Sequence, residues 1–116
     1  EKYRSGGVVS GNMLIGDLRD RTAILIDDLI STGTTLARAA LACRDGGASG
    51  VMALATHGLF TEKAGEVLGD PVLQQLVVSD SVAPGRGGAD ALQPKLAVVS
   101  SAALFGDAIV QLHQDI

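Results

Sequence analysis

The sequence is poor in the residues on which several classes of protein depend. Its 116 residues include a single cysteine, Cys43, and only 3% aromatic side chains. One cysteine excludes a disulfide framework, and its place on the apolar face of a predicted helix is typical of a small core residue. Few aromatic rings and a net charge of −4 leave little to stack on bases or to neutralise a phosphate backbone. We therefore expect no nucleic acid partner.

Long hydrophobic runs and nucleotide-binding loops are also missing. No stretch approaches the roughly twenty apolar residues that cross a bilayer, and the start of the chain has no signal-peptide pattern. We expect no membrane partner and a cytoplasmic location. The glycine-rich, lysine-containing P-loop of many ATPases is absent as well. The remaining composition, 47% hydrophobic and 19% charged residues, describes one globular domain over residues 1–116.

Strand and helix patterns alternate along the chain. The spacing predicts a strand or hairpin within 7–19, core strands at 22–27, 51–56, 76–79 and 96–99, and helices at 35–45, 62–68 and 102–113. We expect the last helix to bury Phe105, Ile109 and Leu112, which recur at spacings of four and three. Such alternation is typical of an α/β fold with a mostly parallel sheet between helices.

The most informative stretch lies at residues 24–36, ILIDDLISTGTTL. Its aliphatic start suits a strand that is covered on both faces. Because ligands of open α/β sheets bind beyond the carboxyl ends of the strands, Asp27 and Asp28 stand where a ligand would lie. Vicinal ribose hydroxyls can donate to such carboxylates, and a magnesium ion with its water shell could share the same place.

The turn that follows the two acids is suited to a phosphate. It offers side-chain hydroxyls, backbone amides and a glycine that can adopt unusual backbone angles. The helix that begins there adds the attraction of its dipole for an anion. The residues concerned are Ser31, Thr32, Gly33, Thr34 and Thr35.

A structural interpretation competes for each part of this stretch. Asp, Ser, Thr and Gly are ordinary residues of strand ends, helix caps and turns, so either part alone favours a structural role. Their joint order favours a ligand site. The same contrast applies to His57 and to the pair Asp80 and Ser81, which follow later strands on the ligand side and have structural roles as the alternative.

Residues 24–36 resemble the ribose 5-phosphate motif of the phosphoribosyltransferase fold, which is a hydrophobic strand, two acids, two apolar residues, a small polar residue and Thr-Gly-Gly-Thr-Leu. Thr34 stands at the second glycine. Residues 55–60, 77–84 and 96–100 resemble, in the same order, the C-terminal half of ribose-phosphate pyrophosphokinases. The resemblance implies a three-layer phosphoribosyltransferase-like fold and a parent enzyme that transfers the pyrophosphoryl group of ATP to ribose 5-phosphate for nucleotide biosynthesis.

The resemblance also implies roles for individual residues. Ser31 to Thr35 would hold the 5-phosphate, and Asp27 with Asp28 would hold the ribose hydroxyls and are the candidate ligands for Mg²⁺. Residues 1–6 look like the remnant of a mobile catalytic loop, in which Lys2 and Arg4 would stabilise the migrating phosphoryl groups. Positive side chains suit that role because the transition state spreads negative charge over several oxygens.

The family pattern further implies a two-domain, homo-oligomeric enzyme of which this chain is the C-terminal half, and most of the ATP site belongs to the other half. We therefore expect the isolated chain to be inactive. Two rivals stay open: a nucleobase phosphoribosyltransferase, and a non-catalytic regulatory relative that binds a sugar phosphate. Ser31 and Thr34 depart from the common pattern and leave room for the regulatory relative, whereas Lys2 and Arg4 favour catalysis.

Overall fold

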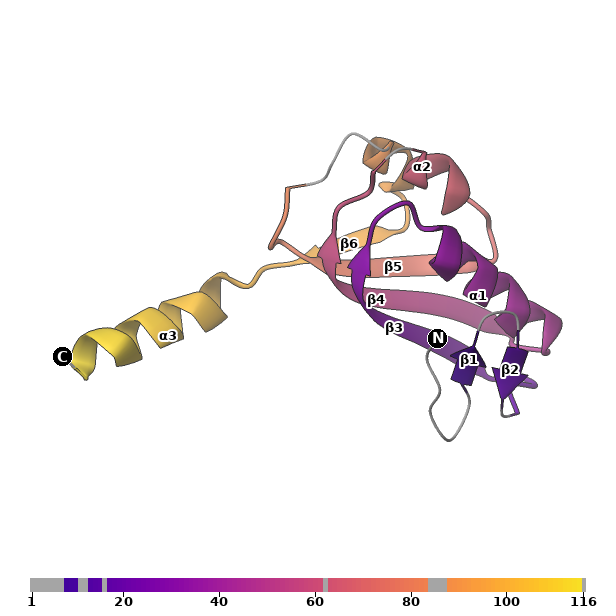
Figure 1. Ribbon diagram of the computed structural model, residues 1–116, viewed down its shortest axis with the longest axis horizontal. Coiled ribbons are helices and arrows are strands. Elements are labelled where there is room, and N and C mark those ends of the chain that lie inside the picture. Colours follow the sequence, from indigo (N-terminus) through magenta and orange to yellow (C-terminus); the bar gives the residue numbers. More distant parts are fainter. Residues whose placement is uncertain (1–7, 11–12, 16, 62, 84–87, 116) are drawn as a thin grey trace.

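The computed structural model describes residues 8–10, 13–15, 17–61, 63–83 and 88–115 (Figure 1). The expected loop remnant at residues 1–6, with Lys2 and Arg4, lies outside the described residues. In chain order the described elements are β1 (Val8–Ser10), β2 (Met13–Ile15), β3 (Thr22–Ile30), α1 (Thr34–Asp45), β4 (Gly50–Gly58), α2 (Ala64–Val67), β5 (Leu73–Ser79), the 3-10 helix η1 (Ala89–Leu92), β6 (Leu96–Val99) and α3 (Ala102–Gln114).

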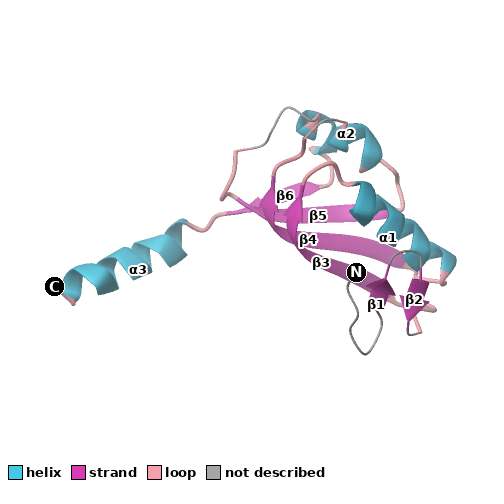
Figure 2. Ribbon diagram, in the orientation of Figure 1, coloured by secondary structure: helices cyan, strands magenta, loops and turns pink. Residues whose placement is uncertain are grey.

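A parallel sheet organises the chain, with strand order β3-β4-β5-β6. Helices α1 and α2 lie over one face of it, and β1 and β2 form a separate antiparallel hairpin (Figure 2). The prediction of an α/β fold with a mostly parallel sheet and flanking helices is confirmed. Parallel pairing places all the carboxyl ends at one edge, where Leu29 lies beside His57 and Ser79 beside Val99.

The core forms between the sheet and the helices that cover it. Alternate residues of the strands point to this face, because successive side chains of a strand point to opposite sides. Helix α1 contributes its buried stripe, which includes Cys43 as expected, and burial raises the pKa of this thiol. Phe60, which follows β4, and Leu68, which follows α2, are among the largest fully buried side chains. The loop after β4 is thus anchored in the core.

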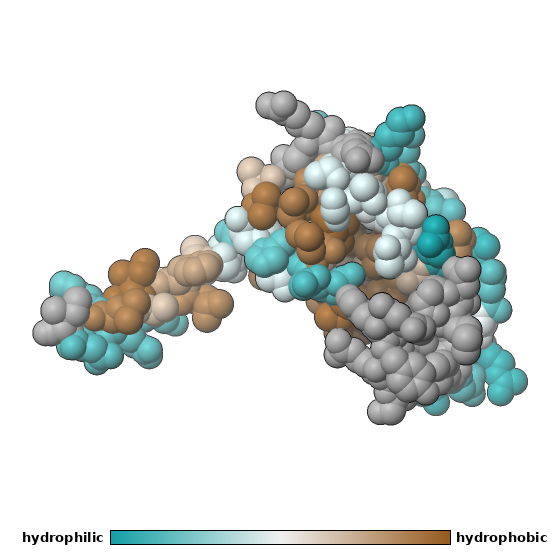
Figure 3. All heavy atoms as spheres, in the orientation of Figure 1, coloured by the Kyte–Doolittle hydropathy of each residue, from teal (hydrophilic) through white to brown (hydrophobic). Residues whose placement is uncertain are grey.

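The opposite side of the sheet carries exposed apolar side chains. Ile24 and Ile26 of β3 are 56% and 77% exposed. Helix α3 extends away from the sheet, and its apolar surface is visible in Figure 3. The predicted burial of its apolar stripe is wrong: Phe105, Ile109 and Leu112 are 60%, 65% and 68% exposed. Periodicity shows that one side of a helix is apolar, but it does not show whether a neighbour covers that side.

Several boundaries also differ from the prediction. Strand β3 continues to Ile30 instead of ending at Asp27, because Leu29 and Ile30 pair with His57 and Gly58 of β4. Strand β5 begins earlier, at Leu73, and helix α2 is only four residues long. Among the helices of the described part of the chain, none has the length and apolar character that crossing a bilayer requires.

Candidate functional site

The two acids lie inside β3, near its carboxyl end. Since side chains alternate along a strand, Asp27 and Asp28 point to opposite faces of the sheet. Asp27 is half-buried and Asp28 is exposed, and the backbone N–H of Asp28 donates to Oδ1 of Asp27 at 2.8 Å. The expectation that the strand ends at Asp27 is therefore wrong. The carboxylates lie on either side of β3, and the strand runs three residues past Asp27 before the turn begins.

The turn after β3 is fixed to the loop after β4. The backbone N–H groups of Leu59 and Phe60 donate to the carbonyl of Ile30 at 2.9 and 3.3 Å. The N–H of Thr61 donates to the carbonyl of Ser31 at 2.9 Å, and the hydroxyls of these two residues lie 3.0 Å apart. Two loops distant in the sequence thus form one surface at the carboxyl edge of the sheet.

Gly33 gives this turn its shape. Its φ of +83° lies in the left-handed region, and it caps the N-terminus of α1, with its carbonyl accepting from the N–H of Ala37 at 2.8 Å. A Cβ at this position would lie 2.7 Å from Cγ of Leu68. Thr34, which replaces the second glycine of the common motif, is the first residue of α1 and has no positive φ. Its backbone therefore does not require glycine.

The start of α1 presents donors to the solvent. The first turn of the helix contains no acidic side chain, and Gly33 can offer no side-chain cap. The hydroxyls of Ser31, Thr34 and Thr35 belong to exposed residues, and Thr32 Oγ1 lies 3.2 Å from Thr34 Oγ1. The N–H of Thr34 donates to Oγ1 of Thr32 at 3.4 Å. The amides that follow it in the first turn and the positive end of the helix dipole attract an anion. This arrangement is chemically suited to a phosphate.

Polar side chains also line the ends of the neighbouring strands. His57 Nδ1 lies 2.6 Å from the Ser81 hydroxyl, and the Ser79 hydroxyl donates to the carbonyl of Thr56 at 2.7 Å. The Asp80 carboxylate accepts from the backbone N–H of Ser101 at 2.9 Å and from its hydroxyl in a short contact. These Ser101 donors lower the pKa of Asp80. The strand ends β3 to β6 therefore form one continuous polar edge.

The links made by Thr61, Ser79 and Ser101 were not anticipated from the sequence. Thr61 was expected only as a cap for the helix after β4, and its bond to Ser31 joins residues thirty positions apart. The available signal was topological: Ser79 ends a strand of the parallel sheet, and Thr61 and Ser101 follow such strands, so all three must lie at its carboxyl edge.

Asp27 and Asp28 could supply only some of the ligands that a magnesium ion requires. Over the described residues, no group of three or more His, Cys, Asp or Glu side chains is placed to hold a metal ion. Mg²⁺ in proteins is commonly bound by one or two carboxylates together with substrate phosphates and water. The exposed carboxylate of Asp28 fits such a shared site, in which the substrate supplies most of the remaining oxygens.

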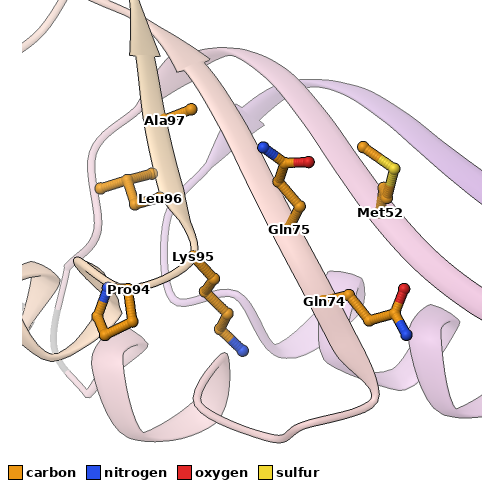
Figure 4. Close-up of a pocket in the computed structure, with 7 residues that line it drawn as sticks. All are labelled: Met52, Gln74, Gln75, Pro94, Lys95, Leu96 and Ala97. Atoms are coloured by element: carbon orange, nitrogen blue, oxygen red, sulfur yellow. The ribbon is translucent and has the colours of Figure 1, made fainter.

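A hollow of about 250 Å³ lies elsewhere, at the amino ends of β5 and β6 (Figure 4). Lys95 lines it, but its ammonium donates to the carbonyls of Asp70 and Leu73 at 3.1 and 2.9 Å, and burial lowers its pKa. The hollow and the turn at Ser31 are thus at opposite edges of the sheet. The other lining residues are Met52, Gln74, Gln75, Pro94, Leu96 and Ala97.

Comparison with known proteins gives a consistent result. The family described as "Phosphoribosyl synthetase-associated domain" matches residues 10–116. A ribose-phosphate pyrophosphokinase of Parasynechococcus marenigrum is 38% identical over 99% of this chain and 34% of its own length. One from Haemophilus ducreyi is also 38% identical, over 99% of this chain and 36% of its own. The chain thus spans about a third of the length of these relatives.

A solved structure agrees in fold. The phosphoribosylpyrophosphate synthetase of Mycobacterium smegmatis superposes with a TM-score of 0.81 at 31% identity, over 89% of this chain and 34% of the other. Both the sequence similarity and the fold therefore extend over nearly all of the chain.

Proposed function

Because the chain belongs to the phosphoribosyl synthetase family of ribose-phosphate pyrophosphokinases, we propose that it carries the ribose 5-phosphate site of such an enzyme. The parent enzyme would transfer the pyrophosphoryl group of ATP to ribose 5-phosphate, giving phosphoribosyl pyrophosphate and AMP. The observation that carries the proposal is the turn between β3 and α1, where exposed hydroxyls lie at the N-terminus of α1, a few residues after Asp27 and Asp28 in the chain.

Each part of ribose 5-phosphate has a chemically matched place at this edge. The turn from Ser31 to Thr35 would hold the phosphate, because amides, hydroxyls and the helix dipole all favour an anion. Asp27 and Asp28 would accept from the ribose hydroxyls, since carboxylates are acceptors with room for several donors. The bond from Thr61 to Ser31 supports the proposal because it holds the turn in place before the ligand arrives.

The rest of the reaction would depend on groups beyond the described edge. Lys2 and Arg4 would stabilise the transferring phosphoryl groups, and Mg²⁺ would supply charge neutralisation at the nucleotide phosphates. We propose that the chain belongs to the C-terminal half of a cytoplasmic, homo-oligomeric enzyme. Because it spans about a third of the length of its relatives, ATP binding would need the remainder.

The ligand site is tested by calorimetric titration of the chain with ribose 5-phosphate. Asp28→Ala should weaken binding by about tenfold to a hundredfold, the range expected when hydrogen bonds to a charged group are lost. Asp107→Ala, an exposed acid on α3, is the matched control and should bind like the wild type. Equal affinity of the Asp28 variant and the wild type would contradict the assignment.

The reaction is tested with a protein of the full length of the relatives. Magnesium-dependent conversion of ATP to AMP in the presence of ribose 5-phosphate is the expected result. Release of pyrophosphate from phosphoribosyl pyrophosphate that depends on an added nucleobase would instead identify a phosphoribosyltransferase. Binding of ribose 5-phosphate without either reaction would identify a regulatory relative.

A further inference from the structure

The ends of β4 and β5 carry a polar cluster that the proposed function does not use. It consists of His57, Ser79, Ser81 and the carbonyl of Thr56. His57 Nδ1 lies 2.6 Å from the Ser81 hydroxyl, while the same hydroxyl lies 3.4 Å from the Thr56 carbonyl. The Ser79 hydroxyl donates to that carbonyl at 2.7 Å and accepts from the backbone N–H of Ser81 at 3.1 Å. The imidazole is therefore held by a network that spans two strands.

The distances in this network favour one of the two tautomers of the imidazole. Ser81 has one hydroxyl proton, and the Thr56 carbonyl already accepts a short hydrogen bond from Ser79. We therefore infer that the Ser81 hydroxyl donates to His57 Nδ1, which lies 2.6 Å away, and not to the Thr56 carbonyl, which lies 3.4 Å away. A neutral histidine that accepts at Nδ1 carries its proton on Nε2. His57 is an exposed residue, so its Nε2–H is a donor available to a ligand.

The position of His57 places this donor beside the candidate ligand site. His57 of β4 pairs with Leu29 of β3. Leu29 is one residue after Asp28 and two residues before Ser31. Neighbouring strands lie about 4.8 Å apart, and residues two apart in a strand share a face, so His57 shares a face with Ala55 and its partner Asp27. A ligand that extends from the turn over the sheet edge would therefore pass close to the imidazole.

Building on the proposed function, we propose that His57 is a further binding residue of the sugar-phosphate site. Its Nε2–H donates a hydrogen bond to an oxygen of the bound pentose phosphate. Ser81 is a positioning residue, which acts through Nδ1 by fixing the tautomer and the orientation of the ring. The interaction is a hydrogen bond from a ring N–H to an anionic or hydroxyl oxygen, which adds directional recognition.

The imidazole nitrogens can be observed directly by ¹⁵N NMR of the wild-type chain. The sequence contains only two histidines, and the second, His113, lies on α3 away from the sheet edge, so it is an internal control. Without ligand, the spectrum of His57 should show the tautomer with the proton on Nε2. Addition of ribose 5-phosphate should shift the His57 signals and leave those of His113 unchanged.

Three variants separate binding from positioning. His57→Ala should weaken ribose 5-phosphate binding about threefold to tenfold, the effect of one lost hydrogen bond, and His57→Gln should restore part of the loss because it keeps a donor. Ser81→Ala should change the tautomer signals of His57 in the free chain. The inference about His57 is wrong, and the proposed function stands, if the wild type binds ribose 5-phosphate without a shift of the His57 signals and His57→Ala binds it with the affinity of the wild type. If ribose 5-phosphate does not bind the wild type, both fail.

Discussion

Gly33 lies directly against the side chain of Leu68, so closely that a Cβ on the glycine would be 2.7 Å from Cγ of the leucine. Leu68 is 1% exposed and belongs to the core cluster. The turn that we assign to the phosphate thus packs against the hydrophobic core. Substitutions at either residue should therefore affect both folding and ligand binding.

Gly33→Ala should lower the free energy of unfolding by roughly 2–5 kcal/mol, from a left-handed backbone penalty of about 1–2 and overpacking of about 1–3. Urea denaturation of the two proteins measures it. Gly47→Ala is the comparison variant: it also has positive φ, and its new Cβ would lie 2.9 Å from Cγ and 3.4 Å from the backbone Cα of exposed Arg19, outside the core. It should lose the backbone part and less of the overpacking part than Gly33→Ala. Equal losses in both variants would show that the contact with Leu68 has no cost.

Thr61→Val removes the hydroxyl that lies 3.0 Å from that of Ser31 while keeping the branched shape. The free energy of unfolding should fall by about 1 kcal/mol or less, because one exposed hydrogen bond is lost. Ribose 5-phosphate affinity should fall roughly twofold to fivefold, since the turn is held by fewer bonds. Thr22→Val, at the other end of β3, should leave the affinity unchanged. An unaffected affinity in Thr61→Val would mean that the two loops act independently.

Ser101→Ala should raise the pKa of Asp80 part of the way to its ordinary value of 3.8, because the backbone donor of residue 101 stays in place. Titration of the carboxyl carbon by NMR measures this. In the wild type the folded pKa is below the unfolded one, so Asp80 stabilises the fold above the unfolded pKa and this contribution is lost as the pH falls through the folded pKa. Ser100→Ala should produce a smaller rise, since Ser100 contributes less. A pKa that Ser101→Ala leaves unchanged would contradict this cause.

Leu68→Ala and Phe105→Ala compare a buried with an exposed apolar residue. The first should lower the free energy of unfolding by about 2–5 kcal/mol through lost burial and a cavity. The second should change it by about 0.5 kcal/mol or less, because Phe105 is 60% exposed. Urea denaturation of both variants provides the comparison. A large loss in Phe105→Ala would show that α3 packs against another surface in solution.

Local chemistry accounts for what the sequence predicted well. The run from Ile24 to Leu36 was expected to form a strand, a turn and a helix, and β3 and α1 confirm this. The strand at 96–99 and the start of the last helix at 102 also agree. In each case hydrophobic spacing and a turn or cap residue point to the same element.

Non-local contacts account for what the sequence did not predict. The acids were expected to end β3, but pairing with His57 and Gly58 extends the strand to Ile30. The bond from Ser31 to Thr61 depends on two loops meeting in space. The exposed apolar stripe of α3 has the same spacing as a buried one. Neither a pairing partner nor a covering surface can be read from the spacing of residues within one segment.

The most direct test of the account is to follow the backbone amide signals of the ¹⁵N-labelled chain during titration with ribose 5-phosphate. We expect the largest shifts at Ser31 to Thr35, with smaller shifts at Asp28 and Thr61. Two results would contradict the assignment of this turn as the phosphate site. One is saturation of the chain with ribose 5-phosphate without any shift in the turn. The other is a set of shifts concentrated around the hollow at the opposite edge, at Met52, Gln74 and Lys95.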